Sequence, residues 1–206
     1  MPFHADHQPT ERREATRLHV LESAIAVLAR DGYAKASWRR IAEEAGVTGG
    51  VLQYHFGDKE HLLQAVVEHL SDEHVRAVEA VHISPELPLR ERVALFVNAS
   101  ADFMSGPGEV AMLEILLAMR APARSAVSDT SSAQMEAAQQ HLWRALFPEV
   151  SQARRTVAYR LLFATLHGLE VQRLIRSEGS RKAELAALGA SIAGLMESGT
   201  PIGVEP

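Results

Sequence analysis

Cysteine is absent from the 206 residues of the chain. Its absence excludes disulfide bonds, thiolate zinc sites and cysteine nucleophiles from any account of the function. It is also compatible with a reducing compartment. Because the sequence shows no other cofactor motif, we expect a protein that works without a metal or an organic cofactor.

Long apolar runs and a secretory signal are absent as well. The longest apolar stretch, at 110–119, is far shorter than the roughly 20 residues that a membrane-spanning helix needs. The first ten residues, MPFHADHQPT, have neither a basic start nor an apolar segment. We therefore expect a soluble cytoplasmic protein without a membrane partner.

The chain also lacks the basic excess that many DNA-binding proteins show. Its formal net charge is −5. Between Tyr33 and Lys59, four basic residues (Lys35, Arg39, Arg40 and Lys59) stand against three acidic ones (Glu43, Glu44 and Asp58), a balance of +1. Composition therefore gives nucleic-acid binding no support, and that function has to be argued from pattern and position.

What the sequence does contain is helical periodicity. Near the C-terminus, Leu185, Leu188, Ile192 and Leu195 follow one another at steps of three, four and three residues, which places them on one face of a helix. Period-2 alternation and hairpin signals are missing. Glycine and proline divide the chain into segments, and the pattern predicts an all-α protein of about nine helices.

Two short helices joined by a glycine turn are predicted at 37–56. Ser37 can cap the first helix and Thr48 the second, since both hydroxyls can accept a backbone N–H. Between them, Gly46 can adopt the positive φ that a tight turn needs. In the second helix, Leu52 and Phe56 share one buried side. This arrangement is a helix-turn-helix, which places its second helix in the major groove of DNA, although it can also be an ordinary part of a helical bundle.

The residues around this motif resemble the DNA-binding domain of the TetR family of transcriptional regulators. The resemblance rests on Leu21-x-x-Ala24, Gly32, Ile41-Ala42, Ala45-Gly46-Val47, Tyr54-His55-Phe56 and Lys59-Glu60-x-Leu62-Leu63. It covers about 14–74 and implies a flexible tail at 1–13, a DNA-binding domain at 14–74, a helical ligand-binding and dimerisation domain at 75–197, and a second flexible tail at 198–206.

The resemblance implies that the chain binds double-stranded operator DNA. The expected contacts are Arg39, Arg40, Thr48, Gly49, Gly50, Val51, Gln53, Tyr54, His55 and Lys59. Lys59 begins a helix, where a cation opposes the helix dipole, and a nearby phosphate would explain it. Arg39 is long enough to reach a guanine edge or a phosphate.

Two positions depart from the family pattern. Gln53 stands where the family usually has a tyrosine, and it can still donate a hydrogen bond to phosphate. Gly49 and Gly50 occupy the usual base-reading positions but have no side chain with which to read a base. We infer that the backbone approaches the DNA closely there, which leaves direct readout to Arg39, Arg40 and the methyl groups of Val51.

Resemblance fades beyond about residue 75, although 167–175 is similar to the BetI-like subgroup. The family implies a homodimer formed through the last two helices, a pseudo-palindromic operator and a small-molecule effector that releases the protein from DNA, in most cases as a repressor. Candidate effector contacts are Phe96, Phe103, Met104, Met112, Leu116, Met119, Trp143, Phe147, Phe163 and His167. Aromatic and methionine side chains at helical spacing are also typical of an ordinary core.

Two alternatives remain open at this point. Glu79-x-x-His82 matches the ligand spacing of four-helix carboxylate metal proteins, which need a second such pair and two further glutamates. The other alternative is a helical interaction module that does not bind DNA. No enzymatic motif of the hydrolase, phosphate-loop or zinc-protease type is present, so we expect no catalytic activity.

Overall fold

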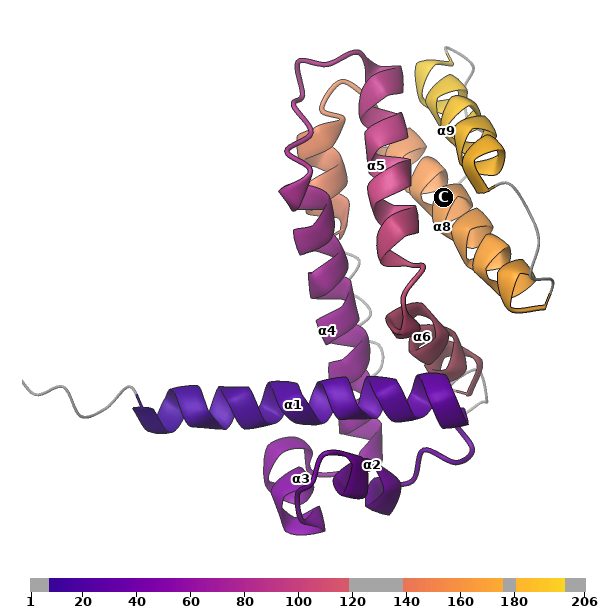
Figure 1. The fold of residues 1–206 in the computed structure, drawn as a ribbon. Coiled ribbons are helices and arrows are strands. Elements are labelled where there is room, and N and C mark those ends of the chain that lie inside the picture. Colours follow the sequence, from indigo (N-terminus) through magenta and orange to yellow (C-terminus); the bar gives the residue numbers. More distant parts are fainter. Residues whose placement is uncertain (1–7, 119–138, 176–180, 199–206) are drawn as a thin grey trace, which may run out of the picture. The chain divides into compact units, whose positions relative to one another are not determined.

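The structure is a computed structural model that describes residues 8–118, 139–175 and 181–198 (Figure 1). Its helices are α1 (Gln8–Asp31), α2 (Trp38–Glu44), α3 (Gly49–Phe56), α4 (Lys59–Ala80), α5 (Leu89–Phe103), α6 (Pro107–Ala118), α8 (Gln152–Ile175) and α9 (Arg181–Glu197). A further helical stretch covers 139–146. Within these ranges the regular structure is entirely helical, which confirms the all-α prediction.

The chain divides into two compact units. Of the described residues, 8–70 and 107–118 form the first unit, and 71–106, 139–175 and 181–198 form the second. Helix α4 contributes its first half to the first unit and its second half to the second. These units differ from the predicted division at 74/75, because they divide α4 after Leu70 and place α6 with the N-terminal helices.

Helix α6 joins the first unit through a buried apolar face. Ala111 and Ile115 are fully buried in one cluster with Leu21 and Leu28 of α1. In addition, the Tyr33 backbone N–H donates to a Glu114 carboxylate oxygen at 2.8 Å. Periodicity predicts that a helix buries a face but does not identify the helix that covers it, which is why the sequence assigned α6 to the other domain.

The N-terminal boundary also differs from the prediction. Helix α1 begins at Gln8, inside the segment 1–13 that was expected to be a flexible tail. Residues 11–13 are Glu-Arg-Arg, which are all good helix formers, and they extend the helix beyond its buried part. Gly32 has a φ of 77° immediately after the last residue of α1, as expected of a left-handed helix cap.

The second unit is built around an aromatic core. Phe96 of α5 packs edge-on against Trp143, with ring centroids 5.0 Å apart, and Trp143 lies 5.3 Å from Phe147. Residues of α8 and α9 complete the same cluster, among them Leu162, Leu166 and Ile192.

A buried histidine lies among these rings. His74 of α4 has its Nε2 atom 2.9 Å from the Ser100 hydroxyl and its Nδ1 atom 3.2 Å from the Gln139 amide nitrogen. Its ring also contacts Phe103 and Phe163 at centroid distances of 5.4 Å. Burial disfavours the charged imidazolium and lowers the pKa of His74 from 6.5 to about 4.

This buried histidine predicts a specific loss of stability in mild acid. The unfolded chain protonates His74 near pH 6.5, whereas the folded chain does so only near pH 4, so the unfolded state binds more protons between these values. The free energy of unfolding should fall by about 2 kcal/mol between pH 6.5 and pH 5 on this account. Denaturant titrations at both pH values should show a clearly smaller fall for His74→Asn.

His82→Asn is the matched control for this experiment, because His82 is exposed and should leave the pH dependence unchanged. Carboxylates whose pKa values are lowered by hydrogen bonds, such as Asp58, lose their contribution only below about pH 4, outside this window. Equal pH slopes for the wild type and His74→Asn would contradict the assignment.

Candidate nucleic-acid interface

The turn between α2 and α3 has the predicted geometry. The Ser37 hydroxyl accepts the Arg40 N–H at 3.2 Å, and the Thr48 hydroxyl accepts the Val51 N–H at 3.4 Å. Gly46 lies between the two helices with a φ of 62°. Both helices are too short to be stable alone, so these caps and the turn fix where each begins and ends.

One face of this pair of helices is buried and the other is exposed. Ile41 of α2 and Leu52 of α3 are fully buried in the core of the first unit, and Phe56 is also buried. On the opposite side, Tyr54 is 68% exposed. None of the ten predicted contact residues is buried, since Val51, His55 and Lys59 are half-buried and the other seven are exposed. Helix α3 thus presents the side that was predicted to face DNA.

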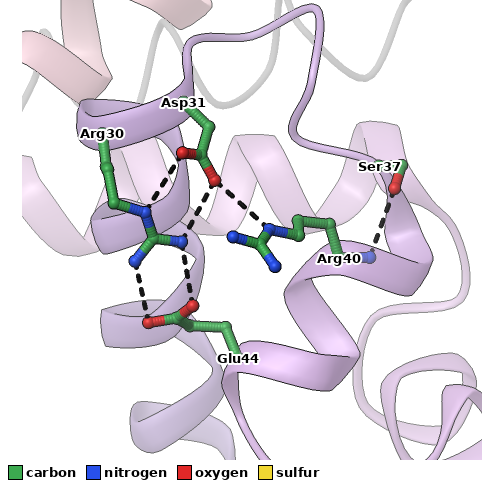
Figure 2. A network of polar contacts seen from close by, with 5 residues as sticks. All are labelled: Arg30, Asp31, Ser37, Arg40 and Glu44. Atoms are coloured by element: carbon green, nitrogen blue, oxygen red, sulfur yellow. Dashed lines mark hydrogen bonds and ion pairs between the residues drawn. The ribbon is translucent and has the colours of Figure 1, made fainter.

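The two arginines of α2 have different surroundings. The Arg39 side chain is 88% exposed and pairs with Glu43 of its own helix, at 2.8 Å. Arg40 instead donates to Asp31 at 3.3 Å, within a network that Figure 2 shows. Arg39 is therefore the better placed of the two for reaching a base or a phosphate.

The network around Arg40 ties α1 to α2 (Figure 2). Arg30 lies at its centre and forms two hydrogen bonds with the Glu44 carboxylate, at 2.9 and 3.1 Å, and two with Asp31. These hydrogen bonds lower the pKa values of Glu44 and Asp31. Since Arg40 is engaged here, its predicted role as a reader of bases is weakened, and we assign it mainly to holding α2 against α1.

Lys59 also has a partner within the fold. Its ammonium nitrogen lies 4.4 Å from the centre of the Tyr33 ring, which is a cation–π distance. Partial burial lowers its pKa. The Tyr33 ring therefore supplies an explanation within the fold for a cation at this helix start. A phosphate contact by Lys59 remains a prediction.

Helix α1 supplies basic residues that the sequence prediction missed. The Arg13 guanidinium lies 5.3 Å from the centre of the Tyr54 ring, and Arg17 lies 5.6 Å from that of Phe56. With Arg12, these cations lie along the N-terminal part of α1, next to α3. A shallow hollow lined by residues of both helices, including Arg12, Tyr54 and His55, lies between them. The basic run at 12–17 was a detectable signal, but it was partly assigned to a disordered tail.

The glycines at the start of α3 are not required by the packing of the first unit. A Cβ atom at Gly49 would lie 3.8 Å from Trp38, and one at Gly50 would lie 3.7 Å from the Thr48 hydroxyl, both ordinary contacts. Neither glycine has a positive φ. The fold would therefore accept a larger residue at both positions.

Comparison with known proteins decides the family. Residues 20–66 match the family of bacterial regulatory proteins known as the tetR family. The HTH-type transcriptional regulator TtgW of Pseudomonas putida is 30% identical over 102 residues, which cover 50% of this chain and 72% of TtgW. The chain belongs to the TetR family.

Other members match this TetR-family chain over shorter parts of their length. The BetI regulator of Paraburkholderia phytofirmans is 29% identical over 99 residues, 46% of this chain and 50% of BetI. For most of the curated relatives, the match spans about half of their length or less. The BetI-like character of 167–175 stays a prediction, because the match does not extend over the whole chain.

The same architecture occurs in solved structures. The FadR regulator of Bacillus subtilis, solved in complex with stearoyl-CoA, superimposes with a TM-score of 0.63 at 18% identity, covering 89% of this chain and 99% of FadR. At this identity the comparison supports the fold alone. In the described part of the TetR-family chain, no helix is long and apolar enough to cross a membrane.

The predicted effector contacts do not form one group. Phe96, Met104, Trp143 and Phe147 are buried in the core of the second unit, and Phe103 and Phe163 pack against it. His167 is half-buried, with its ring 6.3 Å from Phe163.

Two of the predicted effector contacts lie in the first unit, and a third is not described by the structure. Met112 and Leu116 are on α6 in the first unit, and their role as effector contacts stays a prediction. Met119 lies outside the described residues. The second unit also contains a small cavity, of about 20 Å³, next to Trp143. Of its lining residues, only Trp143 was predicted.

Proposed function

We propose that this chain is a transcriptional regulator, and most simply a repressor, that works in the cytoplasm. In this proposal a homodimer binds a pseudo-palindromic operator and a small-molecule effector releases it. The observation that carries the proposal is the exposed face of α3, which has Thr48, Gly49, Gly50, Gln53 and Tyr54 at the surface. The capped turn and the family membership support the same function.

A homodimer through α8 and α9 is supported by the apolar surface of these helices. Leu161, Leu174 and Ile175 of α8 are more than half exposed, which is costly for a lone protomer. A groove between α8 and α9 is lined mainly by apolar and small residues, among them Leu169, Ala187 and Leu195. Two-fold pairing of this surface would cover it and would present two copies of α3 to successive major grooves.

Release by an effector follows from the requirement that the two copies of α3 match the spacing of the grooves. A molecule that binds the DNA-incompetent spacing more tightly shifts the population away from DNA. Reversing a 99:1 population requires a difference in affinity worth about 5.5 kcal/mol. That the structurally similar FadR binds stearoyl-CoA supports a ligand in the helical body, without indicating which ligand this chain takes.

The metal-protein alternative has lost its support. Glu79 is exposed on α4, and His82 lies beyond the end of that helix with a φ of 53° and its Nδ1 atom near the Ala80 carbonyl oxygen. The two side chains therefore do not form an inward-facing pair on one helix. The other alternative, a helical interaction module that does not bind DNA, is distinguished from the regulator by the following experiment.

A salt titration of DNA binding tests the proposal. On a duplex taken from the region upstream of its own gene, the logarithm of the binding constant should fall linearly with the logarithm of the salt concentration. Arg13→Ala should weaken binding and reduce the slope by about one for each protomer, because a phosphate contact is lost. Fluorescence anisotropy over several salt concentrations measures both quantities.

Arg76→Ala serves as the matched control for this titration. Arg76 is exposed in the second unit and pairs with Glu73, so its loss should leave the slope unchanged. An interaction module predicts no affinity for the duplex at any salt concentration. A slope near zero, or equal effects of the two substitutions, would contradict the proposed interface.

A further inference from the structure

Among the described residues of the second unit, two buried polar side-chain atoms have no hydrogen-bond partner. They are the Gln139 amide oxygen and the Trp143 ring nitrogen. The two residues are only 4% and 2% exposed. Leaving such a group unsatisfied costs about 1–3 kcal/mol, so each exception calls for an explanation. Both residues line the small cavity next to Trp143.

The lining of the cavity ranges from buried to exposed residues. Gln139 and Trp143 are its buried members, Arg155, Thr156 and Tyr159 are half-buried, and Arg144 is exposed. Its volume is about 20 Å³. Since roughly 10–15 Å³ holds one water molecule, the cavity has room for one polar head group, and the rest of a ligand would extend towards the exposed lining residues.

The charges around the cavity favour an anion. Arg144 and Arg155 line it, and among the described residues that line it there is no aspartate or glutamate. Arg155 is held in place because its Nη1 atom donates to the backbone carbonyls of Phe147, at 3.1 Å, and Val150. Guanidinium groups bind carboxylates with directed hydrogen bonds as well as charge.

The Gln139 amide can turn its donor towards the cavity. In the structure, the Gln139 amide nitrogen lies 3.2 Å from His74 Nδ1, and His74 Nε2 lies 2.9 Å from the Ser100 hydroxyl. A neutral histidine carries its proton on either nitrogen, and a serine hydroxyl can donate or accept. With the proton on Nδ1, the Gln139 oxygen accepts from His74 and the amide N–H takes the place of the unpartnered oxygen.

We propose that this cavity holds the carboxylate of the effector, which is a small organic monocarboxylic acid with an apolar body. The Trp143 and Gln139 N–H groups donate to the carboxylate oxygens, and Arg144 and Arg155 supply the compensating charge. Tyr159 and the stems of the arginines contact the apolar body. This assignment rests on the proposed function for its regulatory meaning, although the binding site itself does not depend on DNA binding.

Tryptophan fluorescence provides a direct test. The chain has two tryptophans, Trp38 and Trp143, so Trp38→Phe leaves Trp143 as the reporter inside the cavity. Butyrate and butyramide have nearly the same shape and differ in charge. Butyrate at millimolar concentrations should change the Trp143 emission in a saturable way and should bind about tenfold more tightly than butyramide, as the loss of a charge-assisted hydrogen bond predicts.

Substitutions of the lining residues extend the test. Gln139→Glu places a negative charge beside the carboxylate and should abolish butyrate binding. Arg144→Gln leaves an exposed surface position, folds normally and should weaken butyrate about threefold without changing butyramide, as expected of a partly screened charge. Lys182→Gln removes an exposed cation of α9 outside the lining and should have no effect.

The outcomes separate this proposal from the wider function. Equal affinity for butyrate and butyramide, or no saturable change with either, would overturn the carboxylate site. Operator binding is measured on the ligand-free protein, so its failure would refute the regulator while leaving a measured butyrate site intact. Butyrate should release the wild type and Lys182→Gln from the operator, and it should release Arg144→Gln less effectively. That result would establish both the carboxylate site and its regulatory role.

Discussion

Glu149→Gln should lower the free energy of unfolding of the second unit by about 3 kcal/mol, the cost expected when a buried ion pair loses one partner. Arg92 of α5 has a side chain that is 5% exposed, and both Nη atoms donate to the Glu149 carboxylate. Glutamine preserves the shape but removes the charge, so the cation stays buried without its counterion. We place the loss at the lower end of the usual range because Glu149 itself is 47% exposed.

The remaining hydrogen bonds of Arg92 show why Glu149→Gln removes only the opposite charge and leaves the position of the guanidinium unchanged. Its Nε atom donates to the Leu87 carbonyl oxygen at 2.8 Å, and Nη1 donates to the Leu146 carbonyl oxygen. Those bonds survive in Glu149→Gln and keep the guanidinium in place. Denaturant titration followed by circular dichroism measures the effect. Glu86→Gln, an exposed loop substitution, should stay within about 0.5 kcal/mol of the wild type.

The pH dependence provides a second check on the same pair. The Arg92 guanidinium lowers the pKa of Glu149 below its ordinary value of 4.5. The contribution of the ionised Glu149 to the free energy of unfolding is therefore fully present above pH 4.5 and is lost as the pH falls through the lowered pKa. The difference between the wild type and Glu149→Gln should shrink in that range. A difference that is constant down to strong acid would mean that charge is not its source.

The helix-turn-helix could be predicted from the sequence because its determinants are local. The Thr48 cap, the positive φ of Gly46 and the buried pair Leu52 and Phe56 all act within a few residues of one another. Such signals are read directly from spacing. The contacts of Tyr33 with Lys59 and of Arg13 with Tyr54 join residues that are far apart in the chain, and no local pattern encodes them.

The body of the protein was less predictable for a related reason. Aromatic residues such as Phe96 and Trp143 lie together in the core, as is typical of large apolar side chains at helical spacing, and their predicted role as effector contacts stays a prediction. The partner of each helix face could not be derived, so the sequence did not show that α6 packs with the N-terminal helices. The polar pairs of the core, His74 with Gln139 and Arg92 with Glu149, join residues that are far apart in the chain. No local sequence pattern therefore predicts them.

Replacing both Gly49 and Gly50 with alanine should change stability and DNA affinity in opposite directions. Alanine favours helix over glycine by up to about 1 kcal/mol at each position, less near a helix end, so the first unit should become slightly more stable. Added Cβ atoms meet only ordinary contacts inside the molecule. Neither substitution therefore introduces strain into the free protein.

Operator affinity of the same variant should fall by at least tenfold. If the backbone at Gly49 and Gly50 approaches the DNA closely, a methyl group at either position pushes the start of α3 away from the phosphates. The loss of one backbone hydrogen bond to a charged phosphate costs about 1.5–3 kcal/mol, which is roughly tenfold or more in the dissociation constant. Anisotropy on the operator duplex and thermal unfolding of the free protein measure the two effects separately.

Gly46→Ala is the control for this experiment, because it replaces a glycine that the fold requires. Gly46 also has open space around its missing Cβ atom, but its φ of 62° makes alanine strained, at a cost of about 1–2 kcal/mol of stability. A gain of stability at Gly49 and Gly50 with a loss at Gly46 would show that the first pair is not needed for folding. Unchanged operator affinity in the stabilised double variant would mean that α3 does not approach DNA through its first turn, and that Arg39 and Arg13 carry the contact instead.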